Sequence, residues 1–183
     1  MKAWPFLILT LLVCCKSKKA EEPSGSFPVL SFIQSQVAQV DTSLYNITKV
    51  VTVDSTSDTS YLRREDFRKA AQDFLSLPDI ASKKMRNGYT EERTYDQLLE
   101  MAVLTYTARD DDQPVRKEQV FIQPGNGDPD QVKKLIIDVE DGAGATAVRK
   151  NLIWNVGGSF QVVTGTTGPD GREKMVTTRV TWK

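Results

Sequence analysis

The second half of the chain constrains the fold most, because it consists of short β-type segments separated only by short turns. These segments are residues 101–108, 115–123, 132–140, 148–154, 159–164 and 176–182. Turns rich in Asp, Asn, Gly and Pro separate them, and Gly157-Gly158 is a strong hairpin signal. Connections this short let neighbouring strands pair only in the antiparallel direction. The sequence therefore predicts an antiparallel meander.

The first half of the body predicts two helices and one further strand. Apolar residues recur at helical spacing from Val29 to Leu44, and we expect this helix to end near Asp41. A second helical face runs from Phe67 to Leu75 and stops before Pro78. Residues 45–53 are rich in β-branched side chains and predict a strand, whereas 54–60 predict a polar turn and 79–96 an irregular crossing segment.

We therefore expect an α+β fold, with an antiparallel meander sheet of about six to seven strands and two helices packed on one face. The core residues that this arrangement predicts are Ile33, Val37, Phe67, Phe74, Leu135, Ile137, Leu152, Trp154 and Val180. Trp154 and Phe160 also have an alternative interpretation, in which they line an aromatic ligand surface. Alternation along the strands favours the core for Trp154.

The N-terminus predicts export. Met1-Lys2 is followed by an apolar run of residues 3–13, which is too short to span a bilayer, and then by Cys14-Cys15. This arrangement resembles a bacterial lipobox. We expect lipid attachment at Cys15, with Leu12-Val13-Cys14 before it; attachment at Cys14 is the alternative, and it would put bulky Val13 next to the cleavage point.

The expected domain organisation is a signal peptide at 1–14, a lipidated tether at 15–26 and a single domain at 27–183. The tether is polar and contains Pro23 and Gly25. Both cysteines of the chain lie at the signal junction, so no disulfide can stabilise the domain and its stability must come from its core. Lys16 after the cysteine replaces the Asp associated with inner-membrane retention, so we expect an outer-membrane location, on either the periplasmic or the surface face.

The chain also resembles a family of uncharacterised lipoproteins from Bacteroidota. The similarity rests on the lipobox, "REDFRKAAQDFLSLPDI", "LTYTA", "LIWNVGGSFQV" and the terminal "VTWK". It covers most of the mature chain. The resemblance implies membrane attachment through a lipid anchor, but it brings no activity and no catalytic residues.

Composition excludes several kinds of chemistry. The chain has no histidine and no cysteine beyond residue 15, which removes His-dependent catalysis and the usual zinc sites. Its 24 basic and 24 acidic side chains give no reason to expect nucleic acid as a partner. No glycine-rich phosphate motif is present, so we expect no cofactor. The acidic stretches at 110–112, 127–130 and 138–142 do not match calcium-loop spacing and are typical of turns.

We expect a lipid-anchored protein of the cell envelope that acts as a non-enzymatic binding or accessory module, with an envelope protein or a glycan as its partner. The alternative is a carboxylate-dependent hydrolase acting on envelope or dietary glycans, which needs two carboxylates facing each other across a cleft. The sequence supplies carboxylates but no acid, base and nucleophile that could be assembled into one site.

Overall fold

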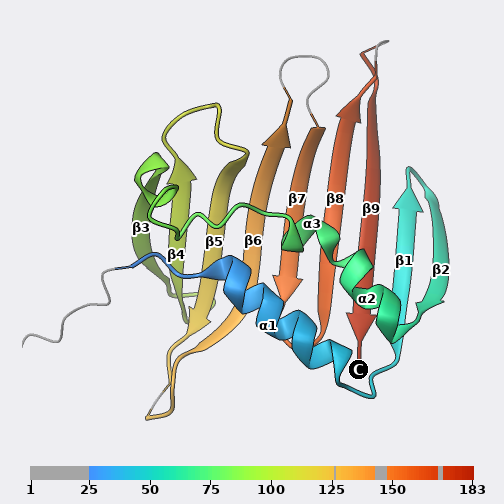
Figure 1. Ribbon diagram of the computed structural model, residues 1–183, viewed down its shortest axis with the longest axis horizontal. Coiled ribbons are helices and arrows are strands. Elements are labelled where there is room, and N and C mark those ends of the chain that lie inside the picture. Colours follow the sequence, from blue (N-terminus) through green and yellow to red (C-terminus); the bar gives the residue numbers. More distant parts are fainter. Residues whose placement is uncertain (1–24, 126, 143–147, 169–170) are drawn as a thin grey trace, which may run out of the picture.

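The chain folds into one nine-stranded antiparallel sheet with helices on one side (Figure 1). The computed structural model describes residues 25–125, 127–142, 148–168 and 171–183. The strands are β1 (Ile47–Val53), β2 (Thr56–Leu62), β3 (Tyr89–Asp96), β4 (Met101–Ala108), β5 (Val115–Gln123), β6 (Gln131–Asp141), β7 (Val148–Asn155), β8 (Ser159–Thr167) and β9 (Glu173–Trp182). Their order across the sheet is β2-β1-β9-β8-β7-β6-β5-β4-β3.

The α+β class and the antiparallel meander are confirmed, but the expected strand number of six to seven is wrong. The two missed strands, β2 and β3, are the two edges of the sheet. Most of β2 falls in the segment 54–60 expected to be a turn, and the true turn is only Asp54-Ser55, where Asp54 adopts a φ of 52°. Nearly every residue of both edge strands is exposed. Neither strand therefore carries the alternation of apolar and polar residues that reveals a half-buried strand.

The N-terminal hairpin completes the sheet by pairing with the last strand. β1 pairs antiparallel with β9, from Ile47 opposite Trp182 to Val53 opposite Val176. The chain must then travel from the β2 edge to the β3 edge. It does so across one face of the sheet, through α2 (Arg64–Ala70), α3 (Gln72–Leu75) and a crossing segment of residues 76–88 that ends in the 3-10 turn η1 (Arg86–Gly88).

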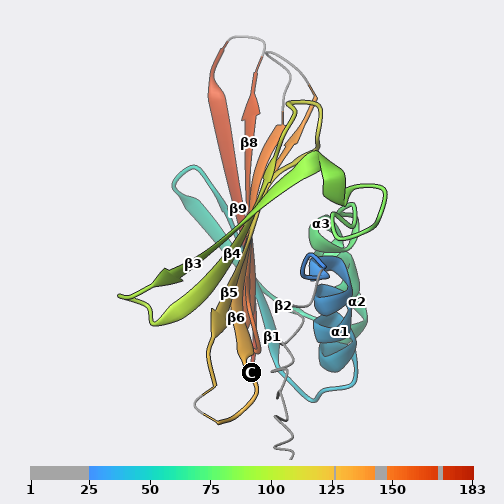
Figure 2. The ribbon, with the colours of Figure 1, turned by 90° about the vertical axis from the view of Figure 1, so that its left-hand side faces the viewer.

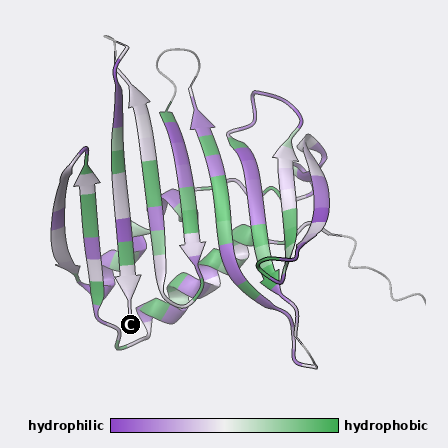
Figure 3. Cartoon of the chain, turned by 180° about the vertical axis from the view of Figure 1, so that it is seen from behind, coloured by the Kyte–Doolittle hydropathy of each residue, from purple (hydrophilic) through white to green (hydrophobic). Residues whose placement is uncertain are grey.

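The helices form a single layer on that face. α1 (Val29–Asp41) packs against α2 and α3, and the ion pair of Asp41 with Arg68 (2.5 Å) links its last turn to α2. The expected second helix is interrupted at Ala71, so α2 and α3 are two short helices. Figure 2 shows all three on one side of the sheet, and the upper ends of β8 and β9 extend beyond them. Figure 3 shows the opposite face, which none of the helices in the described ranges covers.

Five aromatic rings join the helix layer to the sheet. Phe67 of α2 lies 5.1 Å from Trp182, and Phe74 of α3 lies 5.1 Å from Trp154, both in edge-to-face geometry. Phe160 stacks on Trp154 at 5.4 Å. All nine residues expected in the core are buried, namely Ile33, Val37, Phe67, Phe74, Leu135, Ile137, Leu152, Trp154 and Val180. We call Phe67, Phe74, Trp154, Phe160 and Trp182 the aromatic cluster.

We expect Phe74→Ala to reduce the free energy of unfolding by about 3–5 kcal/mol, because it removes a fully buried ring that contacts both Trp154 and Phe160. Urea titration followed by tryptophan fluorescence measures the change. The control is Leu44→Ala, whose side chain is 91% exposed and should change stability by less than about 0.5 kcal/mol. Equal effects of the two substitutions would contradict this description of the core.

Candidate functional site

A cleft of about 540 Å³ opens where the helix layer ends on the inner face of the sheet. Its walls come from α3, the start of the crossing segment and the upper parts of β6 and β7 in the view of Figure 1. The residues that line it are Asp73, Ser76, Leu77, Pro78, Pro114, Val139, Asp141, Val148, Lys150 and Leu152. We call it the α3 cleft. Its volume lies within the range of small-molecule sites, and mostly apolar walls with few polar groups are typical of such sites.

One ion pair crosses the α3 cleft from helix to sheet. Lys150 Nζ of β7 donates to Asp73 Oδ1 of α3 at 2.6 Å, and the two side chains are 32% and 38% exposed. The pair joins residues that are 77 positions apart in the sequence. Partial burial strengthens such a pair relative to one on the open surface, so it holds α3 at a fixed distance from the sheet.

Two polar groups of the cleft, Ser76 and Asp73, are engaged in structural contacts. The Ser76 hydroxyl donates to the Gln72 carbonyl oxygen (2.9 Å) and completes the end of α3. Asp73 is held by Lys150. Nucleophilic catalysis needs a nucleophile within hydrogen-bond reach of a base, and no hydrogen bond between the described lining residues provides this.

A buried acidic side chain lies on the same face, on β5. Glu118 is only 3% exposed and sits between Tyr106 of β4 and Ile137 of β6 in the strand register. Its Oε1 atom has no hydrogen-bond partner among the described residues. Burial, together with the nearby carboxylate of Asp79 on the crossing segment, raises the pKa of Glu118 to about 8. Glu118 is therefore neutral at pH 7, which avoids the cost of a buried unpaired charge.

Two tyrosines accompany Glu118. Burial raises the pKa of Tyr89 to about 12, and its hydroxyl also lacks a partner among the described residues. Tyr106, by contrast, accepts the backbone N–H of Phe27 at 2.8 Å, which ties the start of the described chain to β4. Together Glu118 and Tyr89 form a polar island beneath the crossing segment.

Glu118→Gln should remove a pH-dependent loss of stability. A glutamate in the unfolded chain has a pKa of about 4.3, whereas the pKa of Glu118 in the folded protein is about 8. The folded state thus keeps a proton that the unfolded state releases. The stability that comes from neutral Glu118 is complete below about pH 4 and is lost as the pH rises to 8.

Urea titrations between pH 5 and pH 9 should show this loss, on the order of a few kcal/mol, in the wild type but not in Glu118→Gln. Glu92→Gln, at an exposed position of β3, is the matched control and should follow the wild type. If Glu118→Gln also keeps the wild-type slope, the buried carboxyl does not cause it.

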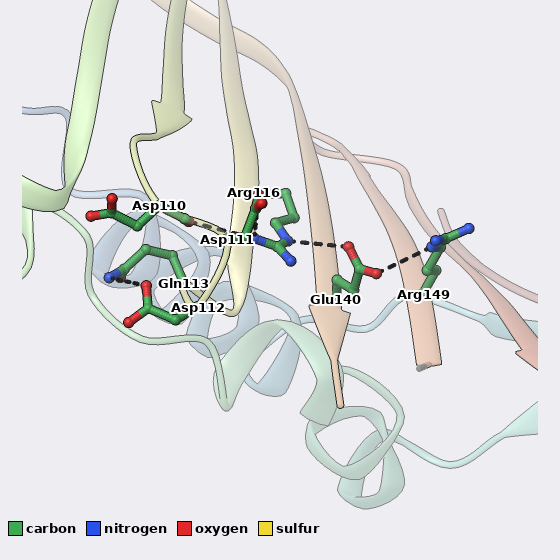
Figure 4. A network of polar contacts seen from close by, with 7 residues as sticks. All are labelled: Asp110, Asp111, Asp112, Gln113, Arg116, Glu140 and Arg149. Atoms are coloured by element: carbon green, nitrogen blue, oxygen red, sulfur yellow. Dashed lines mark hydrogen bonds and ion pairs between the residues drawn. The ribbon is translucent and has the colours of Figure 1, made fainter. Parts of the chain in front are cut away.

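A second hollow, of about 390 Å³, lies on the uncovered face of the sheet. A polar network forms part of its wall (Figure 4). Arg116 contacts Asp111 (3.4 Å) and Glu140 (3.1 Å), and Glu140 also accepts from Arg149 (3.4 Å). Gly165 of β8 is part of the lining, and a Cβ there would meet only the Arg149 carbonyl oxygen, at 3.9 Å. The missing side chain at Gly165 therefore contributes to the hollow.

The structure brings few of the residues singled out from the sequence into a site. Trp154 and Phe160 are fully buried in the aromatic cluster, so their interpretation as a ligand surface is wrong and the core interpretation holds. Cys15, the expected lipid attachment site, and Cys14 lie outside the described residues. Of the carboxylates expected in turns, Asp111 and Glu140 pair with Arg116, and Asp138 accepts from Asn151 (2.7 Å). Asp138 and Glu140 lie within β6, so the turn interpretation is wrong for these two residues.

The residues that form the α3 cleft and the polar island were not found from the sequence. Lys150 and Glu118 occupy inward positions of their strands, where a charged residue breaks the apolar pattern. That break was the available signal. No cluster of three or more acidic, His or Cys side chains that could hold a metal ion occurs in the described ranges. No helix in the described part of the chain is long and apolar enough to cross a membrane.

Comparison with known proteins found no match to this chain among protein-family models, curated proteins or solved structures.

Proposed function

We propose that this protein is an exported, lipid-anchored component of the cell envelope that acts as a binding or accessory module, with the α3 cleft as its binding site. The anchor is inferred from the signal-like N-terminus that ends at Cys15, and from the resemblance to uncharacterised lipoproteins of Bacteroidota. We place it at the outer membrane because Lys16 follows Cys15.

The binding proposal rests on the residues that line the α3 cleft. Its floor and sides are aliphatic, its one basic group is already paired with Asp73, and its volume suits a group of moderate size. Apolar walls gain from covering an apolar group, while the ion pair that crosses the cleft orients it. Such a cleft supports recognition without requiring a chemical step.

Between the two expected partner classes, the lining favours a protein over a glycan. None of the described residues that line the α3 cleft is aromatic, and they are mainly Leu, Val and Pro. These side chains suit an aliphatic side chain from a protein segment. We therefore propose that an envelope protein inserts an apolar residue into the cleft.

Cys15→Ala should move the protein from the membrane fraction to a soluble or unprocessed form, because acyl chains at this residue are the proposed anchor. Fractionation combined with metabolic labelling by a fatty-acid analogue measures both processing and lipidation. Cys14→Ala is the matched control and should stay processed and membrane-bound. The opposite pattern would assign the modification to Cys14. If both variants stay processed and membrane-bound, a lipid anchor at this junction is excluded.

Partner capture should depend on the α3 cleft. Ser76 lines the cleft and is exposed, so Ser76→Trp places a large ring in it without disturbing the core. Gln72, one turn earlier on α3, is also exposed but does not line the cleft, and Gln72→Trp is the control. After cross-linking in intact envelopes, Ser76→Trp should lower the yield of the recurrent partner about tenfold or more.

A third variant tests the uncovered face. Gly165→Val fills the second hollow, at a strand position where a β-branched residue is favourable. If Gly165→Val rather than Ser76→Trp abolishes capture, the binding site lies on the uncovered face and the α3 cleft proposal is wrong. If no variant changes capture and the protein hydrolyses a glycan, the hydrolase alternative replaces it.

The hydrolase alternative has its own observation, since Asp73 and Asp141 both line the α3 cleft. A glycosidase of this type would need one of them as acid and the other as base or nucleophile. Asp73→Asn should then abolish glycan turnover. We rank this function second because Lys150 already engages the Asp73 carboxylate at 2.6 Å.

A further inference from the structure

The connection between β3 and β4 presents an exposed apolar tip. Leu98 is 96% exposed, Leu99 53% and Tyr95 56%. These three lie within five residues of one another, whereas the other exposed large apolar side chains are scattered along the chain, apart from the adjacent pair Leu44 and Tyr45. Single exposed apolar residues need no explanation, but a local group of them indicates a contact surface. We call Tyr95, Leu98 and Leu99 the apolar tip.

The apolar tip is held in a fixed conformation. The Asp96 carboxylate accepts the backbone N–H groups of Leu98 (2.9 Å) and Leu99 (3.0 Å) at the end of the β3–β4 ladder. Glu100 completes the reversal with a φ of 53°. The two leucines are thus presented by a structured turn.

The tip lies at the same edge of the sheet as the point where the chain enters the domain. The Phe27 N–H binds Tyr106 on β4, and Figure 1 places the start of the described chain beside β3 and β4. Five residues of β4 separate Tyr106 from Met101, which is roughly 17 Å along the strand. The expected tether, residues 15–26, spans at most about 40 Å when extended. A bilayer that holds Cys15 is therefore within reach of the tip.

The chemistry of the tip suits a lipid surface of low charge. Leucine favours the apolar side of a membrane interface, and tyrosine is enriched at its polar boundary. The acidic residues Asp96 and Glu100 of the turn itself would be repelled by a strongly anionic surface. A zwitterionic bilayer offers an apolar interior for the leucines and no net surface charge that would repel the carboxylates.

We propose that the apolar tip inserts into the zwitterionic lipid surface to which Cys15 tethers the chain, so that the domain meets the membrane in one orientation. This inference rests on the lipid anchor of the proposed function. Figure 2 shows the β3–β4 hairpin projecting to the side of the sheet opposite the helices. Insertion therefore turns the helix side, with the α3 cleft, away from the bilayer and toward a partner.

A single-cysteine depth measurement tests the insertion. The sequence has no cysteine beyond residue 15, so Leu98→Cys introduces the one labelling site of the acylated protein. Labelled with an environment-sensitive fluorophore and reconstituted into phosphatidylcholine vesicles, it should show blue-shifted emission and quenching by nitroxide lipids. Leu44→Cys, at a 91% exposed position in the connection between α1 and β1, is the control and should stay water-exposed.

The outcomes separate the inference from the function on which it rests. Failure of the wild type to float with vesicles removes the lipid anchor and this inference with it. Flotation with equal, water-like emission at residues 98 and 44 overturns the insertion alone. A change at residue 98 that needs an added envelope protein, and not lipid, also overturns it, because the tip then binds a protein. Adding anionic phosphatidylglycerol should weaken the signal at residue 98; a stronger signal would contradict the proposed lipid preference.

Discussion

Everything in this fold depends on the contact of the helix layer with one face of the sheet through the aromatic cluster. The two edge strands follow each other in the sequence but lie at opposite ends of the sheet, so the chain must cross a whole face between them. The chain crosses this face through α2, α3 and the crossing segment. Phe67 and Phe74 pack these helices against the aromatic rings of the sheet. The crossing also fixes which face is covered and which stays open.

The covered face is not apolar throughout, and its polar side chains lie in two different places. Glu118 and Tyr89 lie where the crossing segment passes over β3 to β5, and burial keeps both neutral. Lys150 and Asp73 form an ion pair where the helix layer ends, and both side chains are partly exposed there. The same sheet face thus holds a neutral acid in its interior and an ion pair at its margin, because access to water differs between the two places.

This margin links structure to the proposed function. The helix layer covers only part of the inner face (Figure 1). The α3 cleft lies on this face, at the end of the helix layer. The apolar tip lies at the opposite ends of the strands and on the opposite side of the sheet. If the tip and the lipid at Cys15 both meet the bilayer, the cleft is directed toward other components of the envelope. Anchoring and binding are then served by separate parts of one rigid sheet.

The sequence by itself determined the antiparallel meander, the α+β class and the core, because hydrophobic alternation and short turns are local properties that leave few alternatives. It could not reveal β2 and β3, whose edge positions leave both faces in water and erase the alternation. Nor could it place Phe160 in the aromatic cluster or pair Lys150 with Asp73, which lie 77 residues apart, since such contacts arise only when distant segments are brought together. The burial of Glu118 and the exposure of Leu98 were likewise decided by tertiary structure, because only packing sets how much water each side chain meets.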